Sequence, residues 1–202
     1  MAWDTLADLQ TVQKTIIALS RRQINAILVE DGAAAHAKIE ELIPQGSEVY
    51  NSSSITLDTT GITKFIEENE RYVSVKKRVF EISDPKKRLD ARRAAVAVKY
   101  YIGSVHAITE DGLVVVASKT GSQLPAYAYT AENVIWVAGT QKIVKNLEEA
   151  FRRIREYTFP LEMERAKKAY GTGTGINKIL IIEKEEIPNR ITLVLVNQVL
   201  GF

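Results

Sequence analysis

The sequence predicts an α/β protein with a largely parallel central sheet. Two short runs, 113–117 and 134–138, are apolar at every position and rich in β-branched residues, as expected for strands covered on both faces. Other strand-like runs alternate along the chain with segments whose apolar residues recur every three or four positions. Such alternation is typical of helices packed against a parallel sheet.

The composition is that of an ordinary globular protein, with 46% hydrophobic and 26% charged residues among 202. This length suits one well-filled core, so we expect a single domain over 1–202. The formal net charge of +2 gives no reason to expect a nucleic acid or an anionic membrane as partner. No apolar run approaches the roughly 20 residues that cross a bilayer, and no secretory signal is visible, so a cytoplasmic protein is expected.

The chain contains no cysteine. Disulfides, a thiol nucleophile, thiolate zinc sites and cysteine-held iron–sulfur clusters are therefore excluded for this chain. The two histidines, His36 and His106, lie on separate predicted elements without metal-ligand spacing. We therefore predict no metal site and assign no cofactor.

The first strand–helix unit lies near the start of the chain. Asp4 is expected to cap a helix that ends at Arg21-Arg22, and a buried strand is predicted at 25–29. A helix over about 33–43 follows, ended by Pro44. The apolar positions of the first helix are Leu6, Leu9, Val12, Ile16 and Leu19.

A second strand at 48–51 runs directly into Ser52-Ser53-Ser54. Thr56 or Asp58 is expected to cap the next helix, which carries Ile62, Phe65 and Ile66. The serines either form a polar capping loop or offer hydroxyl and amide groups to an anion. Both interpretations stay open.

The segment 71–82 is either a short strand or an irregular crossing. Asp84 followed by Pro85 predicts a helix start, and the helix is expected to extend through Leu89 toward Tyr101. A basic cluster near its beginning could meet phosphate, RNA or an acidic partner, but a solvated charged face is favoured. The cluster comprises Lys86, Lys87, Arg88, Arg92 and Arg93.

Glu110 is the sharpest catalytic candidate. Glu110-Asp111-Gly112 is a turn signal between two strand-like runs, and a carboxylate held in a cleft there could act as nucleophile or general acid/base. The alternative is an ordinary polar turn. His106 shares a strand face with Glu110 but would stand roughly 13 Å away in a regular strand, too far for a contacting pair.

Three further loops hold small polar residues at predicted element ends. The run 118–122 (SKTGS) resembles a phosphate cradle but does not match the P-loop. Lys142, after Thr140-Gln141, could add a second cation. The glycine-rich stretch 171–175 follows a helix and precedes a strand, the reverse of the dinucleotide fingerprint. Each loop could equally be a plain connector.

The last third is predicted to contain two helices and two strands. Asn146 and Glu149 form a capping box for a helix that ends near Pro160, and a second helix is expected from Leu161 to about Tyr170. Strands are predicted at 178–182 and 191–196, with a hairpin as the simplest connection.

Four blocks of the sequence resemble the LUD-domain family, named for lactate utilisation. They are 51–57 (NSSSITL), 103–112 (GSVHAITEDG), 136–144 (WVAGTQKIV) and 170–178 (YGTGTGINK), in family order. The resemblance implies a Rossmann-like three-layer α/β/α sandwich, like that of glucosamine-6-phosphate deaminase, ribose-5-phosphate isomerase and the CoA transferases. It also implies a link to L-lactate oxidation, as in lactate-utilisation protein C, with iron–sulfur partner proteins carrying the electrons.

By the same resemblance, Glu110 gains a specific role. In CoA transferases of similar fold, a Glu before a Gly near this position attacks the thioester. Many LUD-domain members read Ala-Glu-Thr-Gly where this chain has Thr109-Glu110-Asp111-Gly112, so the Glu and Gly are kept and the residue between them differs. Glu110 is accordingly the tentative catalytic residue.

We expect Ser53, Glu110, Thr120 and Lys142 to meet at one rim. The full set of expected ligand-binding residues is Ser53, Ser54, Thr56, Thr109, Ser118, Thr120, Gly121 and Lys142. Two functions remain open: an accessory protein of lactate metabolism that binds a small anionic or phosphorylated ligand, or an acyl/CoA transferase or sugar-phosphate enzyme using Glu110. An RNA-binding or scaffold role of 86–93 is a weaker third interpretation, and self-association stays open.

Overall fold

Six parallel strands form the central sheet of the computed structural model, which describes residues 3–202. In spatial order they are β1 (Asn25–Val29), β10 (Ile191–Val196), β7 (Asn133–Gly139), β4 (Tyr100–Gly103), β2 (Glu48–Asn51) and β3 (Val73–Ser74). Every neighbouring pair runs parallel. The predicted α/β class with a parallel central sheet is confirmed. β10 is buried along its whole length, as expected for a strand that is apolar at every position except Thr192.

One face of this sheet is covered by three helices, α2 (Gly32–Leu42), α3 (Ile55–Thr59) and α4 (Ile62–Glu68). Their buried side chains Ile39, Leu57 and Ile66 pack with Val137 and Val194 of the sheet. The single helix predicted after Ser54 is in fact two helices, because Gly61 at φ 74° breaks the backbone between them. Ser54, not Thr56 or Asp58, occupies the N-cap of α3.

The opposite face packs against α1 (Leu9–Arg21), α5 (Val75–Phe80), α6 (Pro85–Ala94) and the π-helix η1 (Ala126–Thr130). Asp8 caps α1 through the amide of Thr11 at 2.9 Å, so the expected cap at Asp4 is wrong. Asp84 caps α6 as predicted, but this helix ends at Ala94 and therefore does not reach Tyr101. The segment 71–82 contains both β3 and α5.

A second, smaller sheet lies beside the central one. Its order is β8 (Ile143–Val144), β5 (Ala107–Thr109), β6 (Val114–Ser118) and β9 (Lys178–Ile182). The antiparallel β5–β6 pair confirms the predicted turn, in which Gly112 adopts φ 91°. The expected hairpin of the last two strands is wrong, because β9 pairs with β6 whereas β10 lies between β1 and β7.

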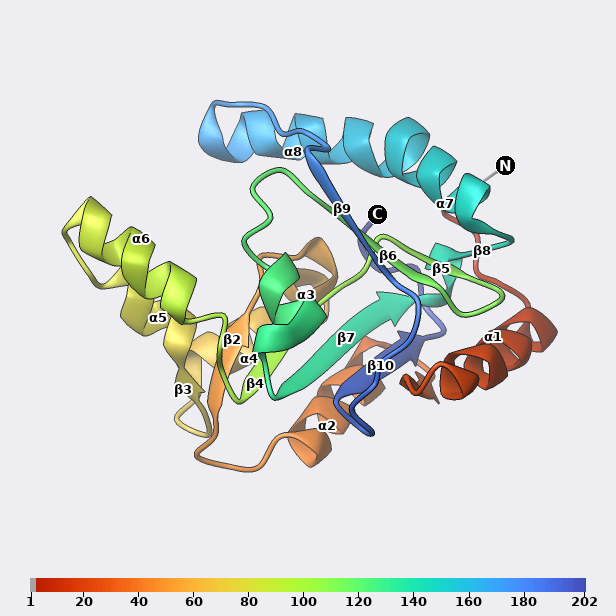
Figure 1. Cartoon of the computed structure of the whole chain (residues 1–202), viewed down its shortest axis with the longest axis horizontal. Coiled ribbons are helices and arrows are strands. Elements are labelled where there is room, and N and C mark those ends of the chain that lie inside the picture. Colours follow the sequence, from red (N-terminus) through yellow and green to blue (C-terminus); the bar gives the residue numbers. More distant parts are fainter. Residues whose placement is uncertain (1–2) are drawn as a thin grey trace.

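A long helical segment covers the outer face of the second sheet. It consists of α7 (Leu147–Arg153), the π-turn η3 (Ile154–Thr158) and α8 (Phe159–Tyr170), and Figure 1 shows α7 and α8 along the top of the molecule. Ala150 and Ile154 pack on Ala107 and Val115 of the sheet. The predicted helix end at Pro160 is wrong, because this residue occupies the first turn of α8, where a missing N–H is tolerated. Within the described residues, no helix is long and apolar enough to cross a bilayer.

Candidate functional site

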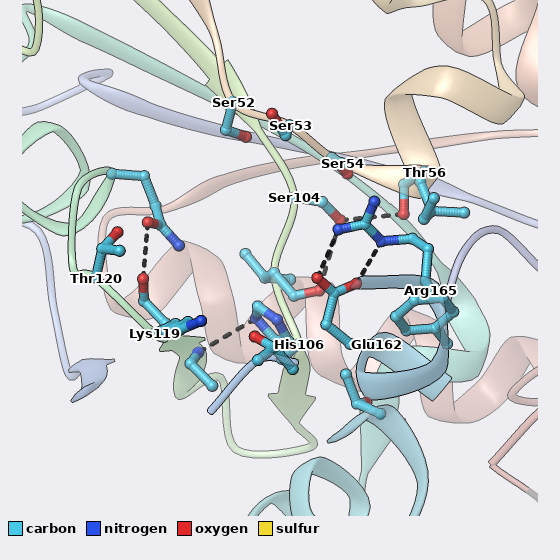
Figure 2. Close-up of a pocket in the computed structure, with 18 of the residues that line it drawn as sticks. Ser52, Ser53, Ser54, Thr56, Ser104, His106, Lys119, Thr120, Glu162 and Arg165 are labelled. Carbon is cyan, nitrogen blue, oxygen red and sulfur yellow. Dashed lines mark hydrogen bonds and ion pairs between the residues drawn. The ribbon is translucent and has the colours of Figure 1, made fainter. Parts of the chain in front are cut away.

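A cavity of about 590 Å³ opens at the carboxyl edge of the central sheet. Segments that follow three neighbouring parallel strands contribute to it: Ser52 follows β2, Ser104 follows β4, and Lys142 lies in the 3₁₀ turn η2 (Thr140–Lys142) after β7. The second sheet and α8 supply further walls, and α3, α5 and α6 contribute Asp58, Lys76 and Arg92. Figure 2 shows the serines and Thr56 on one side, Lys119 and Thr120 on another, and Glu162 beside Arg165. Open α/β sheets bind ligands at this edge.

The structure brings most of the predicted ligand-binding residues together. Those that line the cavity are Ser53, Ser54, Thr56, Ser118, Thr120 and Lys142. Thr109 and Gly121 are not in the lining. Thr109 accepts a hydrogen bond from the Leu113 amide at 2.8 Å inside the β5–β6 turn, and Gly121 donates to Ser118 Oγ at 2.9 Å in a turn with φ 81°. Gly121 therefore shapes a loop beside the cavity, whereas Thr109 stabilises a turn that lies away from it.

Glu110 lies outside the cavity, so its expected place at the rim is corrected. β5 starts beside the cavity and runs away from it. The β5–β6 turn therefore lies over α1, and a Cβ on Gly112 of that turn would lie 2.9 Å from the Ala18 backbone. The Glu110 carboxylate pairs with Lys14 Nζ at 2.7 Å. Of the four residues expected at one rim, Ser53, Thr120 and Lys142 meet there and Glu110 does not.

Lys142 is the buried cation of the site. Its side chain is 2% exposed, and Nζ donates to Thr56 Oγ1 at 3.0 Å, to Ser104 Oγ at 3.1 Å and to the Val105 carbonyl at 3.1 Å. No carboxylate pairs with it anywhere in residues 3–202. Burial, together with the charge of Arg153, lowers the pKa of Lys142 from 10.5 to about 7.

His106 and Arg153 stand behind this lysine. Arg153 is fully buried on α7 and donates to the His106 carbonyl at 2.6 Å and to Thr158 Oγ1 at 3.1 Å. Burial lowers its pKa to about 10. The pKa of His106 falls to about 3, through burial first and then the charges of Lys142 and Arg153. Because His106 Nδ1 accepts from the Ala117 amide at 3.2 Å, the neutral ring carries its proton on Nε2.

Sequence reasoning missed Ser104 and Tyr127. The Tyr127 hydroxyl lies 3.4 Å from Ser52 Oγ and 3.5 Å from the Ser104 carbonyl, and burial raises the pKa of this phenol to about 12. A Cβ on Gly103 would stand 1.8 Å from that hydroxyl, so only glycine fits beneath the ring. A Gly-Ser pair directly after a buried strand could have indicated Ser104. Tyr127 lies in a π-helix, for which no sequence signal was available.

The lining carries more positive than negative charge. Its basic members are Lys76, Arg92, Lys119, Lys142 and Arg165, and its acidic members are Asp58 and Glu162. Two of the cations are paired: Lys76 with Glu67 at 2.8 Å, and Arg165 with Glu162 through two contacts at 2.7 Å. Lys119 reaches across to the Gly173 carbonyl at 2.6 Å. An excess of positive charge in a hollow raises the local concentration of anions.

The parallel sheet covered by helices places the protein in the class of Rossmann-like α/β domains. Its polar, cation-lined cavity lies at the carboxyl edge of that sheet, where such domains bind ligands. The family model of the LUD domain matches residues 12–196, and the chain belongs to this family. The resemblance noted in the sequence is thereby confirmed.

One solved structure supports this fold. The crystal structure of a DUF162 family protein from Deinococcus radiodurans is similar with a TM-score of 0.60 and 10% identity, over 95% of this chain and 99% of that one. At this identity the likeness concerns the fold alone. A crystal structure of eIF2B beta from Chaetomium thermophilum matches 56% of this chain and 40% of its own, with 18% identity and a TM-score of 0.36. The comparison with curated proteins gave no match.

Proposed function

We propose that the cavity binds a small anionic ligand that carries a phosphate or carboxylate group. The observation that carries this proposal is Lys142, a buried amine held by neutral oxygens and without a carboxylate partner in the described part of the chain. A buried ammonium that lacks a counter-ion is strongly disfavoured, and an anion beside it relieves that penalty. The hydroxyl of Ser104 is already within hydrogen-bond distance of the amine and can turn toward a ligand.

The surrounding residues support the same ligand class. Ser52, Ser53 and Ser54 add hydroxyl groups along one wall, and Lys119 and Arg92 add positive charge at the cavity. Charge-assisted hydrogen bonds from lysine, arginine and hydroxyl groups are the usual means of holding phosphate and carboxylate. A cavity of about 590 Å³ has the size of a small-molecule site.

L-Lactate metabolism is the physiological setting that we infer for this binding. The family is named for lactate utilisation, and the resemblance to lactate-utilisation protein C implies iron–sulfur partner proteins. L-Lactate is a small carboxylate with a neighbouring hydroxyl, which suits an ammonium surrounded by hydroxyls. A phosphorylated metabolite would suit the same groups, so both ligand types belong in the test.

Isothermal titration calorimetry at neutral pH tests the proposal. The titrants are inorganic phosphate, L-lactate and ribose 5-phosphate, and the variants are Lys142→Met and Lys64→Met. Loss of a buried charged hydrogen-bond partner is expected to weaken binding at least about tenfold, since such a contact contributes about 1.5–3 kcal/mol. Lys64 is exposed on α4, so its replacement serves as the matched control. Equal affinity of wild type and Lys142→Met would contradict the proposal.

A further inference from the structure

Ser104 and Lys142 stand in the arrangement of a nucleophile with its base. Ser104 Oγ and Lys142 Nζ are 3.1 Å apart, and both residues line the cavity. Ser104 is half-buried, whereas Lys142 is 2% exposed. A ligand in the cavity therefore reaches the hydroxyl more readily than the amine. A weak nucleophile with a base within hydrogen-bond distance, itself oriented by a further group, is the common pattern of covalent catalysis.

The base is held in place from two further sides. Thr56 Oγ1 lies 3.0 Å and the Val105 carbonyl 3.1 Å from Nζ. Thr56 donates its own hydrogen to the Leu200 carbonyl at 3.2 Å, so toward Lys142 it acts as an acceptor. Two N–H groups of an uncharged amine are thus satisfied, and the lone pair is left for the third neighbour, the Ser104 hydroxyl.

Ser104 is suited to both protonation states of the amine. A hydroxyl accepts from an ammonium and donates to a neutral amine, whereas a carboxylate in this place would fix the lysine in its charged form. The other acceptors near Ser104 Oγ are farther away, at 3.3 Å for Thr56 Oγ1 and 3.5 Å for the Val105 carbonyl. With its pKa lowered to about 7, Lys142 is unprotonated in a substantial fraction of molecules at neutral pH.

We propose that Ser104 is a nucleophile and Lys142 its general base for acyl transfer from a small acyl phosphate. This inference rests on the proposed function, because the phosphate leaving group is the anion that the cavity would hold. Ser104 Oγ attacks the acyl carbon while Lys142 accepts the hydroxyl proton. The bond from the acyl carbon to the phosphate oxygen then breaks, and phosphate leaves with that electron pair.

The resulting acyl ester on Ser104 is resolved by water. Lys142, having passed its proton to solvent, takes a proton from the attacking water and returns it to Ser104 Oγ as the ester bond breaks. The products are a carboxylate and inorganic phosphate, so no oxidant or further reactant is needed. Among the titratable groups near this pair are His106 just before β5, Arg153 on α7 and Tyr127 on η1, and these three carry no negative charge at neutral pH. Glu162 of α8 also lines the cavity, and its carboxylate pairs with Arg165.

The test uses acetyl phosphate with an isotope-labelled acetyl group. The full chain is mixed with the reagent, quenched in acid, and mapped by peptide mass spectrometry, while phosphate release is followed in parallel. We expect an acetyl ester on Ser104 in the wild type and none at this position in Ser104→Ala. Phosphate release is expected to fall at least about a hundredfold in Ser104→Ala and in Lys142→Met, the usual effect of losing a nucleophile or general base.

Controls separate this inference from simple binding. Ser83→Ala and Lys64→Met change exposed side chains away from the cavity lining and should leave release unchanged. Ser104→Cys keeps a nucleophile and is expected to acquire a thioester, which confirms the position if Lys142→Met does not fold. Phosphate binding without acetylation of Ser104, unchanged release in Ser104→Ala, or label on the Lys142 amine would each overturn the inference while the binding proposal stands. If the wild type binds none of inorganic phosphate, L-lactate and ribose 5-phosphate, the proposed function is refuted instead.

Discussion

Lys142 shows how a single residue can determine the character of a site. Its ammonium form is desolvated, and three neutral oxygens replace the water that it loses on folding. Neutral acceptors compensate a buried charge less well than a carboxylate does. The folded protein therefore favours the uncharged amine more than the unfolded chain does, and this difference is measurable.

The pH dependence of stability is the corresponding prediction. The folded pKa of Lys142 is about 7 and the ordinary value is 10.5, so between these pH values the unfolded chain binds more protons. The free energy of unfolding then rises with pH, by up to about 1.4 kcal/mol per pH unit from this group. Urea unfolding at intervals from about pH 7 to pH 9 should show this rise in wild type, reduced in Lys142→Met and kept in Lys64→Met. Equal slopes in wild type and Lys142→Met would contradict it.

Gly103 supports a second prediction at this scale. In Gly103→Ala the new Cβ would meet the Tyr127 hydroxyl at 1.8 Å and Ser52 Oγ at 2.6 Å, so the ring or the strand end must move. We expect a loss of about 1–3 kcal/mol in the free energy of unfolding, as in other overpacked cores. Gly173→Ala is the control, because its nearest neighbour is the flexible end of the Met163 side chain. The measurement is urea unfolding, and equal stability of the two variants would count against the packing argument.

Some of the residues that line the cavity could be predicted from the sequence. Ser53, Thr56 and Lys142 were predictable because each is a small polar or cationic residue just after a buried strand. Glu110 was misplaced because a local turn signal does not say which end of a strand pair faces the cavity. The buried position of Arg153 depends on packing between α7 and the second sheet, which no local pattern reveals.

At the scale of elements, capping signals predicted boundaries well where side chains make the cap. Asn146 accepts from the Glu149 amide at 3.0 Å, which is one half of the predicted capping box. The Glu149 carboxylate accepts from the amide of Lys145 at 2.9 Å, one residue before the cap, and not from the Asn146 amide that a capping box would use. Pairing between distant strands was less predictable: the antiparallel match of β6 with β9 depends on a crossover that sequence proximity does not suggest. The π-turns η1 and η3 also had no recognised signal.

The cap of α7 gives a prediction for this scale. Asn146→Ala removes an acceptor for the Glu149 amide and should reduce the free energy of unfolding by about 1 kcal/mol. Ser54→Ala is the matched control, because Ser54 occupies an N-cap position without a side-chain capping bond. Chemical denaturation of both variants measures their free energies of unfolding. A loss in Ser54→Ala as large as that in Asn146→Ala would show that the capping bond is not the cause.

At the scale of the whole molecule, the fold class was the most predictable feature and the cavity followed from it. Parallel strands end at one edge, so the segments after β2, β4 and β7 were bound to lie close together. The contribution of α8 and of the glycine-rich loop was not predicted in this role. These segments reach the cavity because the second sheet and its outer helices stack beside the central sheet (Figure 1).

The distribution of charge over the molecule predicts two kinds of ionic-strength dependence. Lys119 is exposed, so its attraction for an anion is screened by salt, whereas Lys142 is buried and screened far less. Lys119→Glu should weaken phosphate binding several-fold at low salt, and the difference from wild type should shrink at high salt. Lys142→Met should stay weak in both conditions. Titration calorimetry at two salt concentrations measures this, and a salt-independent effect of Lys119→Glu would contradict it.

The place of β10 in the sheet has a consequence for how the chain assembles. β1 is an edge strand of the central sheet, and its pairing partner there is β10. Most of the sequence lies between these two strands. The first strand must therefore wait, during synthesis on the ribosome, until residues 191–196 emerge. Such a high contact order slows folding, because a long loop has to close before the pairing stabilises it. We expect β1 to stay unpaired in a nascent chain until residues 191–196 have been made and have left the ribosome.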